Sequence, residues 1–205
     1  SSGSSSASPS ASSNSSSGLS NEEADKILQE IKVAGDNGTL EAKLEELLQK
    51  AILTDNAALK EYGCQGIMFS YPDLERGKRS DWSKYTARIM QDLNVLLTYK
   101  RWDMIATHNP KGEYGHIQHQ MTSKLVTEVY RCNYKKSNRL YYFGKYYRWN
   151  QLPQVENSLI PLSKDKLDRK IQIINTVYKS QDVKWDRHMM KYENWIAFQD
   201  WKEKN

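Results

Sequence analysis

Apolar residues recur at helical spacing in the first part of the chain, and short polar turns separate the stripes. The first stripe predicts an amphipathic helix over 21–34, opened by a capping-box spacing of Ser20 and Glu23. A second stripe predicts a helix over 39–50, and a third, short helix begins at residue 54 or 55 and ends at Gly63. Residues 21–63 are therefore expected to form a helical segment.

From residue 64 onward the pattern alternates between short apolar runs and longer amphipathic stretches. The runs predict strands over 66–71, 103–108 and 140–149, and the stretches predict helices over 81–100, from 114 or 115 to 131, and over 163–179 and 184–201. Strand–helix–strand alternation is typical of a mostly parallel sheet with flanking helices. We therefore expect an α/β portion over 64–205.

Serine dominates the start of the chain, with 13 of the first 20 residues. Such a stretch buries too little apolar surface to offset its ordering entropy, so residues 1–20 are predicted to be a flexible leader or linker. A Ser-rich stalk would fit an extracellular or cell-surface protein, but the sequence does not fix the localisation. No run approaches the roughly 18 apolar residues of a membrane span, so we expect no transmembrane segment.

Charge is distributed unevenly along the chain. Residues 1–75 carry 5 Lys and Arg against 12 Asp and Glu, whereas residues 76–205 carry 25 against 13. The basic residues are scattered among acidic ones and form no block of five or more. This favours a solvated basic surface over a nucleic-acid interface.

The chain has two cysteines, Cys64 and Cys132. This number excludes a disulfide framework and a four-cysteine zinc site. We expect two unpaired thiols, with a single bridge as the alternative.

Three of the four histidines fall within twelve residues, at His108, His116 and His119. His108 ends a predicted strand, and the i, i+3 spacing of the other two places them on one face of the following helix. Ligands of open α/β sheets collect outside the carboxyl ends of the strands, where this turn is expected to lie. Neutral imidazole is a good zinc ligand. The pattern therefore indicates a metal or catalytic site, with two surface histidines as the alternative.

The same turn resembles a signature of a known enzyme family. Residues 107–119 read THNPKGEYGHIQH, which resembles the second signature of the PIG-L/LmbE family of zinc-dependent N-deacetylases. Tyr71-Pro72-Asp73 resembles the family's early strand end, and Tyr178-Lys179-Ser180-Gln181 resembles the Ser-Gln that closes a late helix. The three matches occur in the family's order and span about 66–181.

The resemblance implies a Rossmann-like fold and hydrolysis of an N-acetyl group from an N-acetylglucosamine-type sugar or glycan conjugate. His119 matches a zinc ligand, and His116 matches the histidine that stabilises the tetrahedral oxyanion. Tyr114 matches a tyrosine that reaches the same oxygen in some members. Another divalent metal is the alternative to zinc. Asp73, Asn109 and Glu113 are expected to bind substrate, although Asp73 equally fits the start of a turn.

One part of the family pattern is missing from this chain. The first signature, His-Pro-Asp-Asp-Glu or a near variant, supplies two zinc ligands and the general base, and no histidine precedes His108 here. One expectation is that an N-terminal fragment of the same protein supplies these groups and completes the fold. The other is a non-catalytic glycan-binding or scaffold homologue that has lost its zinc site. Six aromatic residues between 141 and 149 are candidates to contact a sugar, with packing in the sheet as the alternative.

Overall fold

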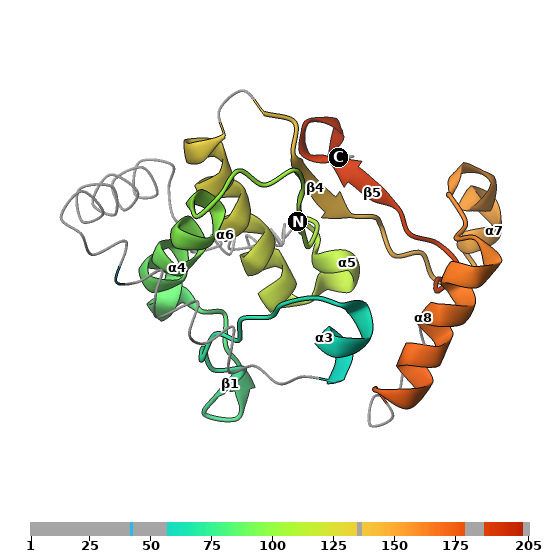
Figure 1. The fold of residues 1–205 in the computed structure, drawn as a ribbon, viewed down its shortest axis with the longest axis horizontal. Helices are drawn as coiled ribbons and strands as arrows, with labels where there is room; N and C mark the ends of the chain where they lie inside the picture. The colour runs from blue at the N-terminus through green and yellow to red at the C-terminus, as the bar shows by residue number, and fades with distance from the viewer. Residues whose placement is uncertain (1–41, 43–56, 135–136, 179–186, 203–205) are drawn as a thin grey trace, which may run out of the picture.

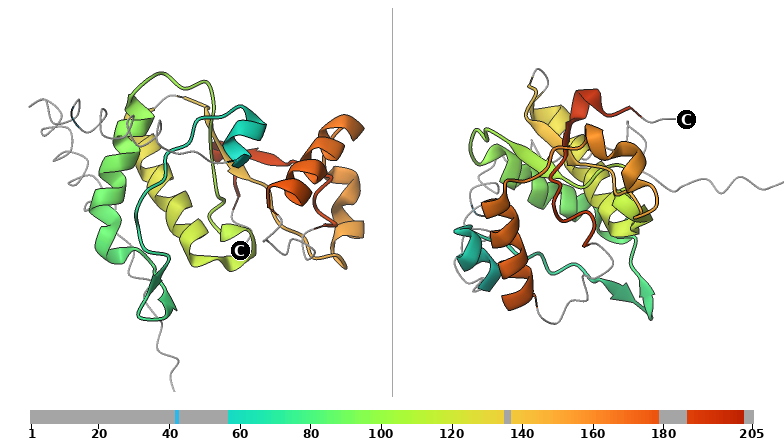
Figure 2. Two further views of the ribbon diagram at one scale, coloured as in Figure 1. Left: turned by 60° about the horizontal axis from the view of Figure 1, so that its bottom comes forward. Right: turned by 90° about the vertical axis from the view of Figure 1, so that its right-hand side faces the viewer.

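The computed structural model describes residues 42, 57–134, 137–178 and 187–202. Its helices are α3 (Ala57–Tyr62), α4 (Thr86–Thr98), α5 (Gly112–Gly115), α6 (Ile117–Asn133), α7 (Leu152–Val155) and α8 (Lys164–Thr176). Its strands are β1 (Leu74–Glu75), β2 (Lys78–Arg79), β3 (Ile105–Thr107), β4 (Leu140–Phe143) and β5 (Trp195–Ala197). The chain is thus a mixed α/β protein, as the sequence predicts. Helices α4 and α6 lie side by side, and α7 and α8 lie at the opposite end of the molecule (Figures 1 and 2).

The larger sheet has the order β3-β4-β5. β3 and β4 are parallel, with Ile105 opposite Leu140, and β5 pairs with β4 in the antiparallel direction. The parallel pair agrees with the prediction, but the sheet is mixed rather than mostly parallel. β1 and β2 form a separate two-stranded antiparallel hairpin.

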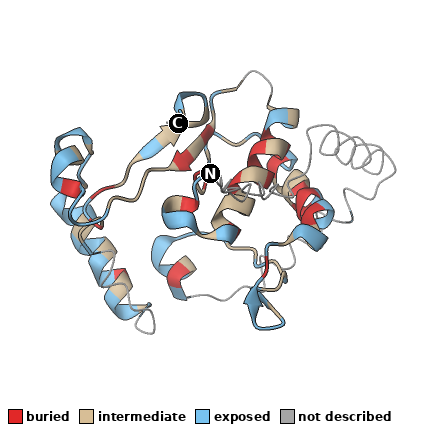
Figure 3. Cartoon of the chain, turned by 180° about the vertical axis from the view of Figure 1, so that it is seen from behind, coloured by how far each residue is buried: buried red, intermediate tan, exposed pale blue. Residues whose placement is uncertain are grey.

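The main core lies where α4 and α6 cover one face of β3 and β4. Its fully buried members include Met90 of α4, Leu125 and Val129 of α6, and Leu140 of β4. Figure 3 shows buried residues, in red, on both helices and on β4. Burying apolar side chains of this size contributes about 1.5–3 kcal/mol each, so this layer holds β3, and the turn that follows it, in a fixed place.

The first predicted strand, over 66–71, is wrong. These residues form no ladder with a described strand. Tyr71 instead packs against the core and donates a hydrogen bond to the carboxylate of Asp92 in α4, at 2.6 Å. An apolar run is compatible with a strand, but a strand forms only where a neighbouring strand can hydrogen-bond to its backbone N–H and C=O groups.

The last part of the chain differs from the prediction in two places. The strand predicted over 140–149 ends at Phe143, although the backbone amide of Gly144 still donates a hydrogen bond to Asn194, next to the last residue pair of β4 and β5. The helix predicted over 184–201 is wrong for its described residues, which form a turn, then β5, and then a 3-10 turn over Phe198–Asp200. Pairing with β4 overrides the helical spacing there.

The helices predicted over 81–100, 114–131 and 163–179 are confirmed as α4, α6 and α8, and the short helix ending at Gly63 is confirmed as α3. Cys64 and Cys132 form no disulfide with one another, as expected. The predicted leader, the helix over 21–34, the helix over 39–50 apart from the helical Ala42, and the Lys179–Gln181 part of the third family match lie outside the described residues. Within the described part of the chain, every helix is too short or too polar to cross a membrane.

Candidate functional site

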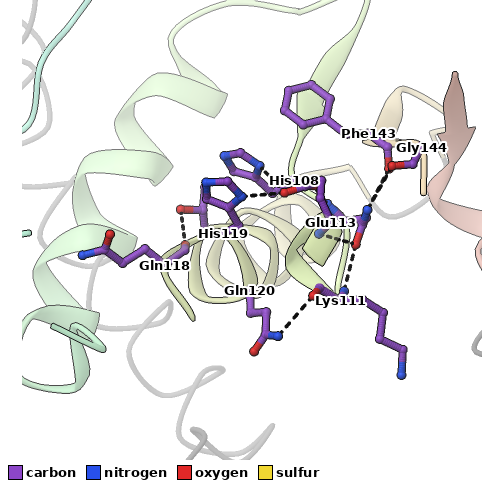
Figure 4. Close-up of polar contacts among 10 residues, drawn as sticks. His108, Lys111, Glu113, Gln118, His119, Gln120, Phe143 and Gly144 are labelled. Atoms are coloured by element: carbon purple, nitrogen blue, oxygen red, sulfur yellow. Dashed lines mark hydrogen bonds and ion pairs between the residues drawn. The ribbon is translucent and has the colours of Figure 1, made fainter. Parts of the chain in front are cut away.

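The candidate site begins where β3 ends, and a buried asparagine shapes its turn. Asn109 is 1% exposed. Its side-chain amide donates hydrogen bonds to the backbone oxygens of Phe143 and Gly144, both at 3.2 Å. Its Oδ1 accepts from the backbone amides of Lys111 and Glu113, at 2.9 and 3.2 Å (Figure 4). These four bonds use both hydrogen atoms and both lone pairs of the side-chain amide, and they join the turn to the end of β4. The predicted contact of Asn109 with substrate stays a prediction.

The turn itself is a strained loop rather than the first turn of the helix. Glu113 has a φ of 56°, in the left-handed region, and Gly112 and Gly115 beside it also have positive φ. A Cβ on Gly112 would lie 2.8 Å from Cγ of Gln120. The regular helix α6 starts at Ile117, so His116 precedes it and His119 lies in its first turn. Positive φ in a glutamate is uncommon and costs on the order of 1–3 kcal/mol.

This backbone places one carboxylate between two histidines. Oε2 of Glu113 lies 3.1 Å from Nδ1 of His108 and 2.6 Å from Nδ1 of His119. The two imidazole rings stack, with centroids 3.8 Å apart and planes 12° apart (Figure 4). A neutral imidazole that donates from Nδ1 has an unprotonated Nε2, which is the state that binds a metal or accepts a proton.

The electrostatics favour an anionic glutamate beside neutral imidazole. Burial raises the pKa of Glu113, but the hydrogen bonds from His108, the Asn109 amide and His119 lower it more, and the net pKa lies below its ordinary value. Burial and the neighbouring His108 lower the pKa of His119, against the opposing effect of Glu113. The cluster therefore combines the negative charge of Glu113 with a neutral imidazole at His119.

His116 extends the stack on the other side of His119. Their ring centroids are 4.3 Å apart, and the Nδ1 of His116 is buried without a hydrogen-bond partner among the described residues. Tyr114 is half-exposed, and its ring lies 6.0 Å from that of His116 and 5.8 Å from that of His119. The structure thus brings the three predicted residues His116, His119 and Tyr114 together with His108.

Asp73 lies beside this cluster rather than in it. Its carboxylate pairs with Arg79 at 2.7 Å, and its backbone oxygen accepts a hydrogen bond from the side chain of Gln118. Gln118 belongs to α6, between the two helix histidines, so Asp73 borders the start of that helix. Its predicted contact with a substrate hydroxyl stays a prediction.

His108, Glu113 and His119 form a set of possible metal ligands, with ligand atoms within 4.8 Å of one another. Catalytic zinc usually takes three protein ligands from histidine and carboxylate. Sequence reasoning assigned only His119 to the metal and gave Glu113 to the substrate. His108 was detectable as a ligand candidate because it directly follows a buried strand, but the shared carboxylate depends on the positive φ of Glu113.

Comparisons with known proteins give the chain a relative without a described function. No family model matches the chain, and no solved structure matches it. It is similar to an uncharacterised protein of Acanthamoeba polyphaga mimivirus, 31% identical over 136 residues. The matched residues are 65% of this chain and 50% of the viral protein, so the chain spans about half the length of this relative. The resemblance to the PIG-L/LmbE family therefore stays a prediction.

Proposed function

We propose that this chain carries part of the active site of a metal-dependent hydrolase, which removes the N-acetyl group from an N-acetylglucosamine-type sugar or glycan conjugate. The observation that carries the proposal is the shared carboxylate of Glu113, which orients the imidazoles of His108 and His119 at the carboxyl end of a parallel strand. A resemblance in the sequence of the same turn adds support. In this proposal β3 and β4 belong to a Rossmann-like sheet.

The donor set suits zinc, because it offers two imidazoles and one carboxylate. His108, Glu113 and His119 would hold the metal, provided that each imidazole offers it an unprotonated nitrogen. When bound, zinc polarises a carbonyl and lowers the pKa of a bound water toward neutrality. The buried, partnerless Nδ1 of His116 and the half-exposed Tyr114 lie next to this set.

Residues of this chain also take part in the hydrolysis of the amide. A water oxygen adds to the amide carbon, the C–N bond breaks, and acetate and the free amine leave, the amine taking up a proton. His116 donates a hydrogen bond to the oxygen on which negative charge develops, and Tyr114 assists it. His116 directly precedes α6, and the N-terminus of a helix favours negative charge nearby.

The site needs further groups for complete catalysis. Glu113 is occupied by the two imidazoles, so no carboxylate of the described cluster remains as a general base. We propose that an N-terminal fragment of the same protein, bearing the His-Pro-Asp-Asp type of signature, supplies the base and further ligands. The viral relative, which extends well beyond the matched residues, is compatible with this arrangement.

A second candidate is a glycan-binding or scaffold protein that has lost its zinc site. One observation favours it: Glu113, His108 and His119 already satisfy one another by hydrogen bonds without a metal. This candidate predicts no stoichiometric zinc by elemental analysis and sugar binding that depends on Tyr114.

Acetate release separates the two candidates. The chain, together with the fragment that carries the first signature, is loaded with zinc and mixed with N-acetylglucosamine conjugates. The hydrolase proposal predicts acetate release that a chelator abolishes and zinc restores. Chelator-insensitive release, or none from the zinc-loaded assembly, would contradict it.

A further inference from the structure

A second hollow adjoins the histidine cluster. It is a cavity of about 190 Å³ whose walls come from four parts of the chain. Glu113 and Tyr114 form the wall toward the histidines, and Tyr146, which follows β4, lines the cavity beside Tyr114. Lys170 of α8 and Glu193 complete it. Glu113 and Tyr114 belong both to this cavity and to the histidine cluster. A group bound in the cavity is therefore adjacent to a ligand bound at the histidines.

Aromatic rings line one side of the cavity. The rings of Tyr114 and Tyr146 lie 6.3 Å apart at 76° to one another, and Tyr146 in turn contacts the ring of His188 at 5.6 Å. Of the tyrosines proposed from sequence to contact sugar, Tyr142 is buried in the core, whereas Tyr146 faces this cavity. Tyr146 and Phe143, which also lines the cavity, are therefore the aromatic residues of that segment placed to contact a ligand beside the histidines.

The polar side of the cavity is an ion pair. Nζ of Lys170 lies 2.5 Å from Oε1 of Glu193, and both side chains are partly buried. Such a pair offers donors and an acceptor side by side, which suits the neighbouring hydroxyls of a sugar. It does not suit an anion, because Glu193 repels negative charge and neutralises Lys170. Lys145 is the other basic residue of the wall, and its amine lies 5.6 Å from the ring of Trp201, which is not one of the lining residues.

The cavity also has a fixed shape. Gly144 and Asn194, both in its wall, are joined by a backbone hydrogen bond of 2.6 Å. A Cβ on Gly144 would lie 2.6 Å from the backbone oxygen of Asn194, so only glycine allows this approach. At about 190 Å³ the cavity is smaller than the roughly 300–1,000 Å³ of a pocket for a drug-sized ligand. It therefore suits one small ring.

We propose that this cavity is a subsite for a second, neutral sugar ring, linked to the acetamido sugar that lies at the histidines. Tyr146 stacks on the ring, and the Lys170–Glu193 pair binds its hydroxyls. This inference rests on the proposed function and makes it more specific, because it selects an uncharged glycan over a sugar whose neighbouring group is a phosphate.

Binding measured on the full chain by titration calorimetry tests the inference separately from catalysis. The probes are N-acetylglucosamine, its β-linked disaccharide, and N-acetylglucosamine 1-phosphate. The disaccharide is expected to bind about tenfold more tightly than the monosaccharide, from one ring contact and one hydrogen-bonded pair. N-acetylglucosamine 1-phosphate is expected to bind no more tightly than the monosaccharide.

Matched variants assign the preference to the cavity. Tyr146→Ala and Lys170→Met are expected to bring the ratio of disaccharide to monosaccharide affinity close to one. Tyr99→Ala, at an exposed tyrosine after α4, and Lys164→Met, at an exposed ion pair of the same helix α8, should leave the ratio unchanged. Circular dichroism melting confirms that each variant is folded.

The outcomes of the two tests are distinguishable. A disaccharide preference that needs Tyr146, without acetate release, supports the subsite and contradicts the hydrolase. Acetate release with equal affinity for both sugars supports the hydrolase and contradicts the subsite. Tighter binding of the 1-phosphate, a preference that survives both cavity variants, or no binding of either sugar overturns the subsite.

Discussion

Oε2 of Glu113 lies 2.6 Å from Nδ1 of His119, and the same oxygen lies 3.1 Å from Nδ1 of His108. A single carboxylate thus sets the orientation of two stacked imidazoles. The contact exists because Glu113 adopts a positive φ between two glycines, while Asn109 fixes the start of the turn. The following predictions test whether this relationship has the functional meaning that we propose.

Glu113→Gln is expected to weaken zinc binding at least about tenfold, because carboxylates that orient or share metal ligands typically contribute a factor of 10 to 100. The amide has no charge, and its NH2 group would face an N–H of one histidine. A competition titration with a chromophoric chelator measures the affinity. Glu156→Gln, at a carboxylate paired with Lys191 on another part of the surface, is the matched control and should not change it.

His119→Ala and His116→Ala are expected to have different effects on bound zinc. Loss of His119 removes a ligand, so bound zinc and turnover should fall together. Loss of His116 leaves the ligand set in place, so zinc should remain while turnover falls on the order of a hundred- to a thousandfold, as for one oxyanion donor. Elemental analysis and initial rates on the complete assembly decide. Loss of zinc in His116→Ala but not in His119→Ala would reverse the two roles.

Asn109→Ala is expected to destabilise the fold by about 2–4 kcal/mol, since it leaves two backbone oxygens and two backbone amides without their partner. Urea unfolding measures the change in free energy. The exposed Asn150→Ala should stay within about 0.5 kcal/mol of wild type. A similar small effect at Asn109 would show that the turn does not depend on this side chain.

Gly112→Ala is expected to cost more than Gly77→Ala, although both glycines have positive φ. At Gly77 the new methyl group meets open space, so only the backbone strain of about 1 kcal/mol applies. At Gly112 it also meets Gln120. Unfolding in urea gives the two free energies, and the chelator titration should show weaker zinc binding in Gly112→Ala alone. Equal effects in both assays would exclude a special role for the turn.

The helices of this fold were predictable because their signal is local. Ile89 and Leu93 of α4, and Leu125 and Val129 of α6, repeat at helical spacing whatever the rest of the chain does. Strands depend on partners far along the chain. The run at 66–71 has the composition of a strand but pairs with none of the described strands, whereas 195–197 has helical spacing but pairs with β4.

The sequence predicted which histidines belong to the candidate site, but not which hydrogen bonds join them to Glu113. The spacing of His116 and His119 places both at the start of one helix, and His108 follows a strand by composition. The role of Glu113 depends on a single backbone angle, which no pattern in the sequence specifies. The sequence does not indicate that Tyr146, beyond the end of β4, lines the cavity beside Tyr114, whereas Tyr142 is buried in the core.

The central claim is that the cluster of His108, Glu113 and His119 holds a metal, and anomalous diffraction at the zinc edge from zinc-soaked crystals tests it most directly. The account predicts one strong peak at this cluster, about 2.0–2.2 Å from a nitrogen of His119, with the hydrogen bond between Glu113 and His119 opened. A zinc-soaked crystal with no peak there, in which Oε2 of Glu113 still lies at hydrogen-bond distance from both histidines, would contradict it.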